Sequence, residues 1–87
     1  MIDAAMFSNA DRNFYSDLVA RHVVVKIISV TGCAMSEGMF RRIYVDVYNF
    51  LYTCKRMFKT ADKLIDYLVE HFYTMSDLYI ERQELPT

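Results

Sequence analysis

The sequence predicts an all-α fold: a small three-helix domain with a C-terminal helical hairpin, which we expect to pack as a dimer. Two successive segments, 37–58 and 61–82, each repeat apolar residues at the three- and four-residue spacing of an amphipathic helix. Only two glycines and one proline occur among the 87 residues, which leaves few turns for a β fold. We therefore predict one helical domain over residues 1–87, with helices at approximately 9–31, 37–58 and 61–82.

The first predicted helix, 9–31, has recognisable signals at both ends. Ser8 followed by Asp11 resembles a capping box, and Gly32 is the residue type that commonly ends helices in the left-handed conformation. The interior is ambiguous, because the β-branched run over 23–30 favours a strand. Strict alternation of apolar and polar residues is absent there. We therefore expect a buried central helix, with a strand over 23–30 as the alternative.

The second and third predicted helices follow each other closely. Ser36 and Thr60 are typical N-cap residues for them, and Asp62 lies in the first turn of the third helix, where a carboxylate is favourable. A turn of one or two residues near Lys59 and Thr60 would make the pair an antiparallel hairpin or a sharp corner. The apolar stripe of the second helix comprises Met39, Phe40, Ile43, Tyr44, Val47, Phe50, Leu51, Cys54, Met57 and Phe58. The stripe of the third comprises Ala61, Leu64, Ile65, Leu68, Val69, Phe72, Met75, Tyr79 and Ile80.

The charges are nearly balanced overall but divided along the chain. The formal net charge is −1, so no global attraction to nucleic acid or anionic lipid is expected. Residues 33–60 carry five basic and two acidic side chains, a net charge of +3. Residues 61–87 carry two basic and six acidic side chains, a net charge of −4.

The features that indicate cellular location are few. The two cysteines, Cys33 and Cys54, are too far apart for a CxxC motif and too few for the disulfide framework of a small extracellular domain. The segment 1–10 has no basic start and no apolar core of the signal-peptide type. No uncharged run approaches the roughly 18 residues that a membrane span needs. We therefore expect an intracellular, cytoplasmic protein that does not enter a membrane.

A second non-polar strip lies on the predicted second helix, away from its core stripe. Val45, Tyr48 and Tyr52 form this strip, and Arg41 and Arg56 flank it. Tyrosine and arginine are enriched among the residues that dominate binding energy at protein interfaces. We therefore predict that Arg41, Val45, Tyr48, Tyr52 and Arg56 bind a partner protein. The alternative is that the two tyrosines pack against the first helix with their hydroxyls in water.

The third predicted helix carries an acidic strip that consists of Asp66, Glu70, Asp77, Glu81 and Glu84. Like charges four residues apart on a helix repel by a few tenths of a kcal/mol, and a basic partner would relieve this repulsion. The basic side of the second helix in another copy is one candidate, because a two-fold dimer would form that contact twice. The alternative is an ordinary solvated helix face.

No motif for catalysis, cofactor binding or metal binding is recognisable. His22 and His71 are isolated in the sequence, and HExxH, GxSxG and glycine-rich phosphate motifs are absent. The carboxylates lie on the predicted wet side of a helix, where the shifted pKa values that acid–base catalysis needs are not expected. We therefore expect a non-enzymatic binding module or regulator without cofactor or metal, whose partner is another protein, a second copy of itself, or both.

One alternative function is DNA binding. The first helix, a turn containing Gly32, and a second helix that opens with Arg41 and Arg42 loosely resemble a helix-turn-helix. Glu37 would sit at the end that enters the groove, and an overall basic surface is missing. A protein partner is therefore the preferred interpretation, and nucleic acid is not expected.

Two short segments resemble a known family. Ile28–Thr31 (ISVT), followed after a gap by Phe40–Ile43 (FRRI), is similar to a stretch in small helical phage proteins that bind a host sigma factor. The similarity is confined to these eight residues. It implies a small regulator that acts by binding another protein.

Overall fold

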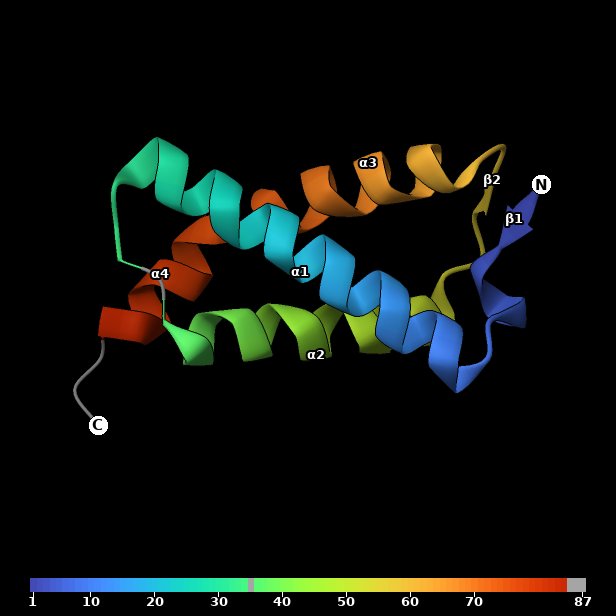
Figure 1. Ribbon diagram of the computed structural model, residues 1–87, viewed down its shortest axis with the longest axis horizontal. Coiled ribbons are helices and arrows are strands. Elements are labelled where there is room, and N and C mark those ends of the chain that lie inside the picture. The colour runs from blue at the N-terminus through green and yellow to red at the C-terminus, as the bar shows by residue number, and fades with distance from the viewer. Residues whose placement is uncertain (35, 85–87) are drawn as a thin grey trace.

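Helices dominate the part of the chain that the computed structural model describes, residues 1–34 and 36–84, with side chains up to Glu81 (Figure 1). The α-helices in this part are α1 (Asn9–Thr31), α2 (Glu37–Thr53), α3 (Ala61–Tyr73) and α4 (Ser76–Glu84). A 3₁₀ turn, η1 (Ala4–Met6), and two short strands, β1 (Ile2–Asp3) and β2 (Met57–Phe58), complete it. The predicted all-α class is confirmed, but the helices number four rather than three in the described residues.

Helix α1 has the boundaries that its capping signals predict. The Ser8 hydroxyl accepts a hydrogen bond from the Asp11 backbone N–H, and the Asp11 carboxylate accepts one from the Ser8 N–H, each 3.1 Å long. At the other end, Gly32 adopts φ 73° and its N–H bonds to the Ile28 carbonyl. The β-branched run 23–30 is helical, because burial of its inward side chains against neighbouring helices outweighs its preference for a strand.

Gly32 provides a test of this cap. We expect Gly32→Ala to lower the free energy of unfolding by about 1 kcal/mol, because φ 73° strains any residue with a Cβ although nothing lies within 4 Å of it. Gly38→Ala, inside α2, is the control and should raise stability by up to about 1 kcal/mol, since alanine favours helix. Urea denaturation followed by circular dichroism measures both. Equal effects would contradict the assignment of the cap.

The predicted helix 37–58 is wrong at its carboxyl end, because α2 stops at Thr53. The chain becomes extended and Met57–Phe58 pairs in antiparallel register with Ile2–Asp3. The predicted turn of one or two residues is therefore a longer connection that contains β2. Phe58 still reaches the core, whereas Met57, assigned to the apolar stripe, is exposed. Backbone groups of this segment form hydrogen bonds with β1 in place of the bonds that a continuing helix would provide.

The predicted helix 61–82 is also divided, by a turn at Thr74–Met75 between α3 and α4. The Thr74 hydroxyl donates to the His71 carbonyl at 2.5 Å, and the Met75 N–H bonds to the Phe72 carbonyl at 3.1 Å. Threonine hydroxyls compete in this way for carbonyls that a continuing helix would use. The division lets α4 turn away from α3 and pack against α2 (Figure 1).

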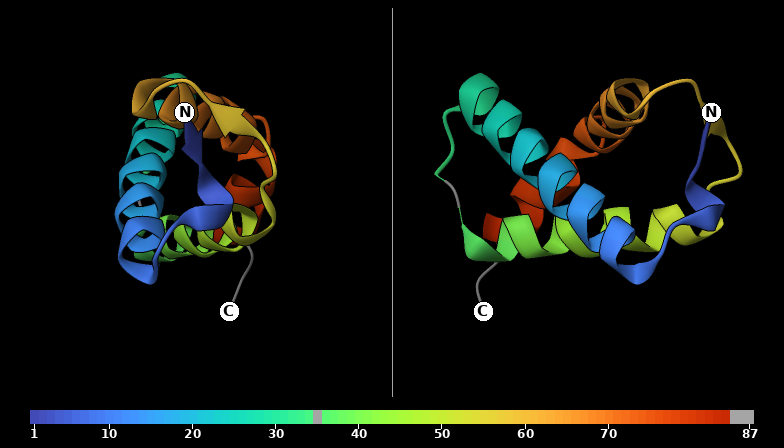
Figure 2. Two further views of the ribbon diagram at one scale, coloured as in Figure 1. Left: turned by 90° about the vertical axis from the view of Figure 1, so that its right-hand side faces the viewer. Right: turned by 45° about the vertical axis from the view of Figure 1, so that its right-hand side comes forward.

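The helices surround one apolar core. Helix α1 crosses diagonally over α2 and α3, which run in opposite directions, and it packs against both (Figures 1 and 2). Phe50 of α2 and Phe72 of α3 meet edge to face with ring centroids 5.6 Å apart, so α2 and α3 also touch. The largest fully buried apolar side chains in the described residues are Val19, Val23, Ile27, Ile43, Val47, Leu51, Leu64 and Leu68.

Candidate functional site

Two of the predicted binding residues, Tyr48 and Tyr52, lie across the junction of α1 and α2. The Arg12 guanidinium of α1 lies 4.0 Å from the centre of the Tyr52 ring and 5.7 Å from that of Tyr48. Both tyrosine hydroxyls donate to the Asn9 side-chain oxygen, that of Tyr48 at 3.3 Å and that of Tyr52 at 3.5 Å. The two tyrosines thus pack against the first helix, as the alternative interpretation expects, while Tyr52 remains exposed.

Arg12 is central to this junction, although helical spacing in the sequence gives no signal for it. Its side chain is buried, and its guanidinium donates to the Phe7 carbonyl at 2.6 Å and to the Asn9 side chain. A hydrogen bond from Arg12, and then one from Tyr52, lowers the pKa of Tyr48 from its ordinary value, because both stabilise the phenolate. Arg12 therefore joins the helices through aromatic faces and hydrogen bonds, and this arrangement is a structural one.

The other predicted binding residues are separated from each other. Arg41 is exposed and forms an ion pair with Glu37 one turn earlier, at 3.1 Å, and Val45 is exposed on the same helix. Arg56 lies beyond the end of α2, where its guanidinium stands 4.6 Å from the centre of the Tyr67 ring. The five residues therefore do not form one continuous strip, because α2 ends before Arg56.

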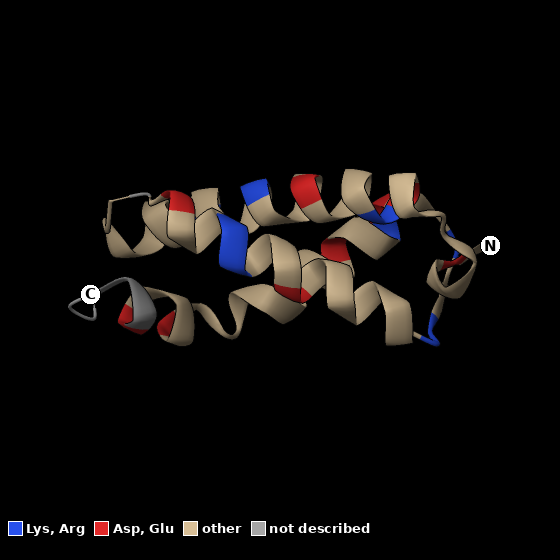
Figure 3. Ribbon diagram, turned by 90° about the horizontal axis from the view of Figure 1, so that it is seen from below, with Lys and Arg blue, Asp and Glu red and all other residues tan. Residues whose placement is uncertain are grey.

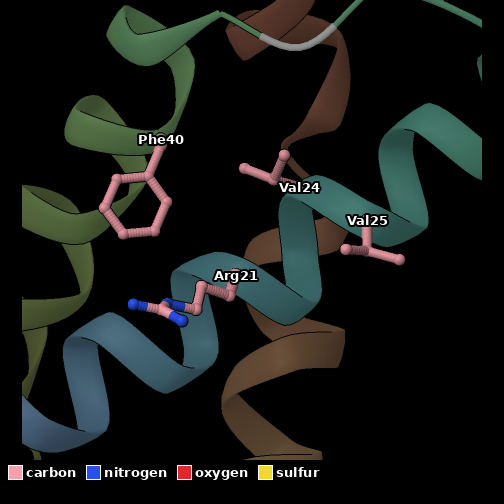
Figure 4. A pocket seen from close by; sticks show the side chains of 4 residues that line it. All are labelled: Arg21, Val24, Val25 and Phe40. Carbon is pink, nitrogen blue, oxygen red and sulfur yellow. The ribbon is translucent and has the colours of Figure 1, made fainter.

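A hollow between α1 and α2 lies near Arg41. Arg21, Val24 and Val25 of α1 and Phe40 of α2 line it, and Val24 is the valine that extends toward the side of Phe40 (Figure 4). Its volume is about 430 Å³. Val25 is 63% exposed although it is aliphatic, and Phe40 is half-buried. We call this hollow the α1–α2 groove.

Two smaller hollows continue the same surface along α2. One, of about 310 Å³, includes Phe40 and Arg41, and the other, of about 290 Å³, includes Arg41 and Val45. The remaining side chains and backbone that line them come from Glu37, Gly38, Arg42 and Tyr44. Arg41 and Val45 thus lie beside the groove, on the start of α2.

The arginines around the groove are held by weak ion pairs within their own helices. These pairs are Arg21 with Asp17 at 3.0 Å, Arg41 with Glu37 at 3.1 Å, and Arg42 with Asp46 at 3.6 Å. Exposed pairs one helical turn apart contribute about 0.3–0.5 kcal/mol. A carboxylate on a partner can therefore replace the intrahelical carboxylate at little expense in free energy.

One feature of the sequence indicates an exposed apolar residue on α1, although the spacing of apolar residues along the helix does not show which residue it is. Val23, Val24 and Val25 are consecutive, and residues in a helix turn by about 100° each, so the three cannot all face one core. Phe40 fits the core stripe of α2 by spacing. Its exposure depends on how α1 crosses α2 near that point, which the spacing does not encode.

Comparisons with known proteins add no assignment. No protein-family model, curated protein or solved structure matches this chain. Among the described side chains, no group of three or more His, Cys, Asp or Glu is placed to hold a metal ion. Likewise, none of the helices in the described residues combines the length and apolarity needed to cross a membrane.

Proposed function

We propose that this protein is a non-enzymatic interaction module that binds a helix of a partner protein in the α1–α2 groove. The observation that carries the proposal is the exposed Val25 in an apolar hollow between two helices, which Val24 and Phe40 also line. Grooves of this kind accept the apolar face of an amphipathic helix. Full burial of a valine or phenylalanine side chain contributes about 1.5–3 kcal/mol. Val25 and Phe40 are already partly buried, so each contributes the part of this amount that belongs to its exposed surface.

The arginines give the surface its preference among partners. Arg21 lines the groove, and Arg41 and Arg42 lie on the adjoining surface of α2. Guanidinium groups form paired hydrogen bonds with carboxylates, which favours a partner helix that carries acidic residues beside its apolar ones. Val45 extends the apolar part of this surface. In this proposal Tyr48 and Tyr52 hold α2 in place, and Arg56 takes no part.

A charge introduced into the groove tests the proposal. We expect Val25→Asp to weaken partner binding at least about tenfold, because it removes apolar contact and places a carboxylate where a partner side chain would be buried. The immobilised protein is incubated with a lysate of the cells in which the chain occurs, and the amount of each captured protein is compared between wild type and variant.

Val30→Asp is the matched control for this experiment. Val30 lies on the same helix and is 65% exposed against 63% for Val25, but it does not line the groove. Circular dichroism should show equal helix content for both variants. Capture that survives in both variants, or that is lost equally in both, would contradict the proposed site.

A further inference from the structure

Helix α4 has an inner and an outer side. On the inner side Tyr79 is buried, and its hydroxyl donates to the Asp46 carboxylate of α2 at 2.9 Å. On the outer side Leu78 is 51% exposed, and Asp77 and Glu81 are exposed beside it. The outer side therefore presents one large apolar side chain next to two carboxylates that are four residues apart.

This outer side is chemically complementary to the α1–α2 groove. The groove is lined by Val24, Val25 and Phe40 and has an arginine at its edge, with two more arginines on the adjoining surface. An exposed leucine can enter such a hollow while the carboxylates next to it meet the arginines. Two successive segments of the sequence show the same opposition, with a net charge of +3 over 33–60 and −4 over 61–87.

The two surfaces belong to the same half of the molecule. Helix α4 and the start of α2, where Phe40 lies, are at the same end, with acidic residues on α4 beside the C-terminus (Figures 1 and 3). Within one copy, the bond from Tyr79 to Asp46 holds α4 against α2, and none of the α4 side chains that the structure describes, up to Glu81, lines the groove. A second copy related by a two-fold axis at this end could donate its α4 and receive one in return.

We propose that the α1–α2 groove is occupied by α4 of a second copy of this chain. Leu78 enters the hollow between Val25 and Phe40, and Asp77 and Glu81 pair with the arginines of the receiving copy. The contact forms twice in each dimer. This inference rests on the proposed function, because it names the partner of the same groove.

Charge exchange between the two surfaces tests this inference. The variant D77K/E81K makes α4 basic, and the variant R21E/R41E makes the groove surface acidic. Arg42 is left unchanged because its partner Asp46 holds Tyr79. Wild type should be a dimer by sedimentation equilibrium, and each variant alone should dissociate at a concentration at least about tenfold higher.

An equimolar mixture of the two variants should restore the dimer. Each contact in the mixed dimer then joins one acidic and one basic surface, with the charges exchanged at one of the two sites. The control D62K/D66K makes the same change in net charge on α3, at exposed positions outside α4, and should leave the wild-type dimer intact. Helix content by circular dichroism verifies that each variant is folded.

Three results would overturn the inference: a wild type that is monomeric at every concentration, equal weakening by D62K/D66K and D77K/E81K, or folded variants whose mixture stays monomeric. A monomeric wild type whose capture of another protein depends on Val25 would leave the proposed function standing. If Val25→Asp changes neither the capture of other proteins nor the dimer, both the proposed function and this inference are wrong.

Discussion

Phe72→Ala is expected to lower the free energy of unfolding by about 3–5 kcal/mol, the largest effect of any single substitution considered for this chain. Phe72 is only 2% exposed, and its ring meets Phe50 of α2 edge to face. Truncation removes this contact and leaves a cavity where α3 approaches α2. Small domains have about 5–15 kcal/mol of stability in total, so the variant should unfold at a much lower urea concentration.

Phe14→Ala is the matched control, because it makes the same chemical change at a phenylalanine of α1 that is 61% exposed. Its effect should stay within about 0.5 kcal/mol, as for most surface substitutions. Similar losses in the two variants would contradict the position of Phe72 in the core. Such a result would also contradict the contact of Phe72 with α2.

The parts of the fold that were predicted correctly depend on interactions between near neighbours in the chain. The capping box at Ser8 and the left-handed glycine at position 32 lie within a few residues of the helix ends that they determine. The helical spacing of Ile43, Val47 and Leu51 predicted the inner face of α2, and all three are buried. Short-range periodicity and capping are sufficient for such features.

The features that were missed depend on distant segments or on a local competition for hydrogen bonds. After α2 ends, Met57–Phe58 pairs with Ile2–Asp3, which lies near the amino terminus and far earlier in the chain. Each strand has only two residues, too short for an alternating pattern to appear. The turn at Thr74 depends on the hydrogen bond from the Thr74 hydroxyl to the His71 carbonyl. The helical spacing of apolar residues continues across this turn, so it gives no sign that the helix ends.

The candidate site was predicted only in part for a related reason. Arg41 and Val45 are exposed because they lie off the apolar stripe of α2, and helical spacing is enough to predict this. The burial of Arg12 under Tyr48 and Tyr52 requires the crossing position of α1 on α2, which helical spacing does not fix. The partner-binding role of these residues stays a prediction, which the groove variants test.

Asp46→Ala is expected to lower the free energy of unfolding by about 1.5–3 kcal/mol, the usual range for losing a hydrogen bond to a charged group. Asp46 accepts the Tyr79 hydroxyl at 2.9 Å, and Tyr79 is buried, so the variant leaves a buried donor without this acceptor. Because this bond joins α4 to α2, the loss should appear as increased amide hydrogen exchange in α4 before global unfolding.

Asp46→Asn separates the two interactions of this side chain. The asparagine keeps an oxygen acceptor for Tyr79 but removes the charge that pairs with Arg42 at 3.6 Å. That ion pair is partly exposed and contributes only a few tenths of a kcal/mol, and a neutral hydrogen bond contributes about 0.5–1.5 kcal/mol. Asp46→Asn should therefore retain about half of the stability that Asp46→Ala loses. If both variants lose the same stability, the tyrosine bond does not hold α4. The helix would then lack the fixed orientation that presents Leu78 to a second copy.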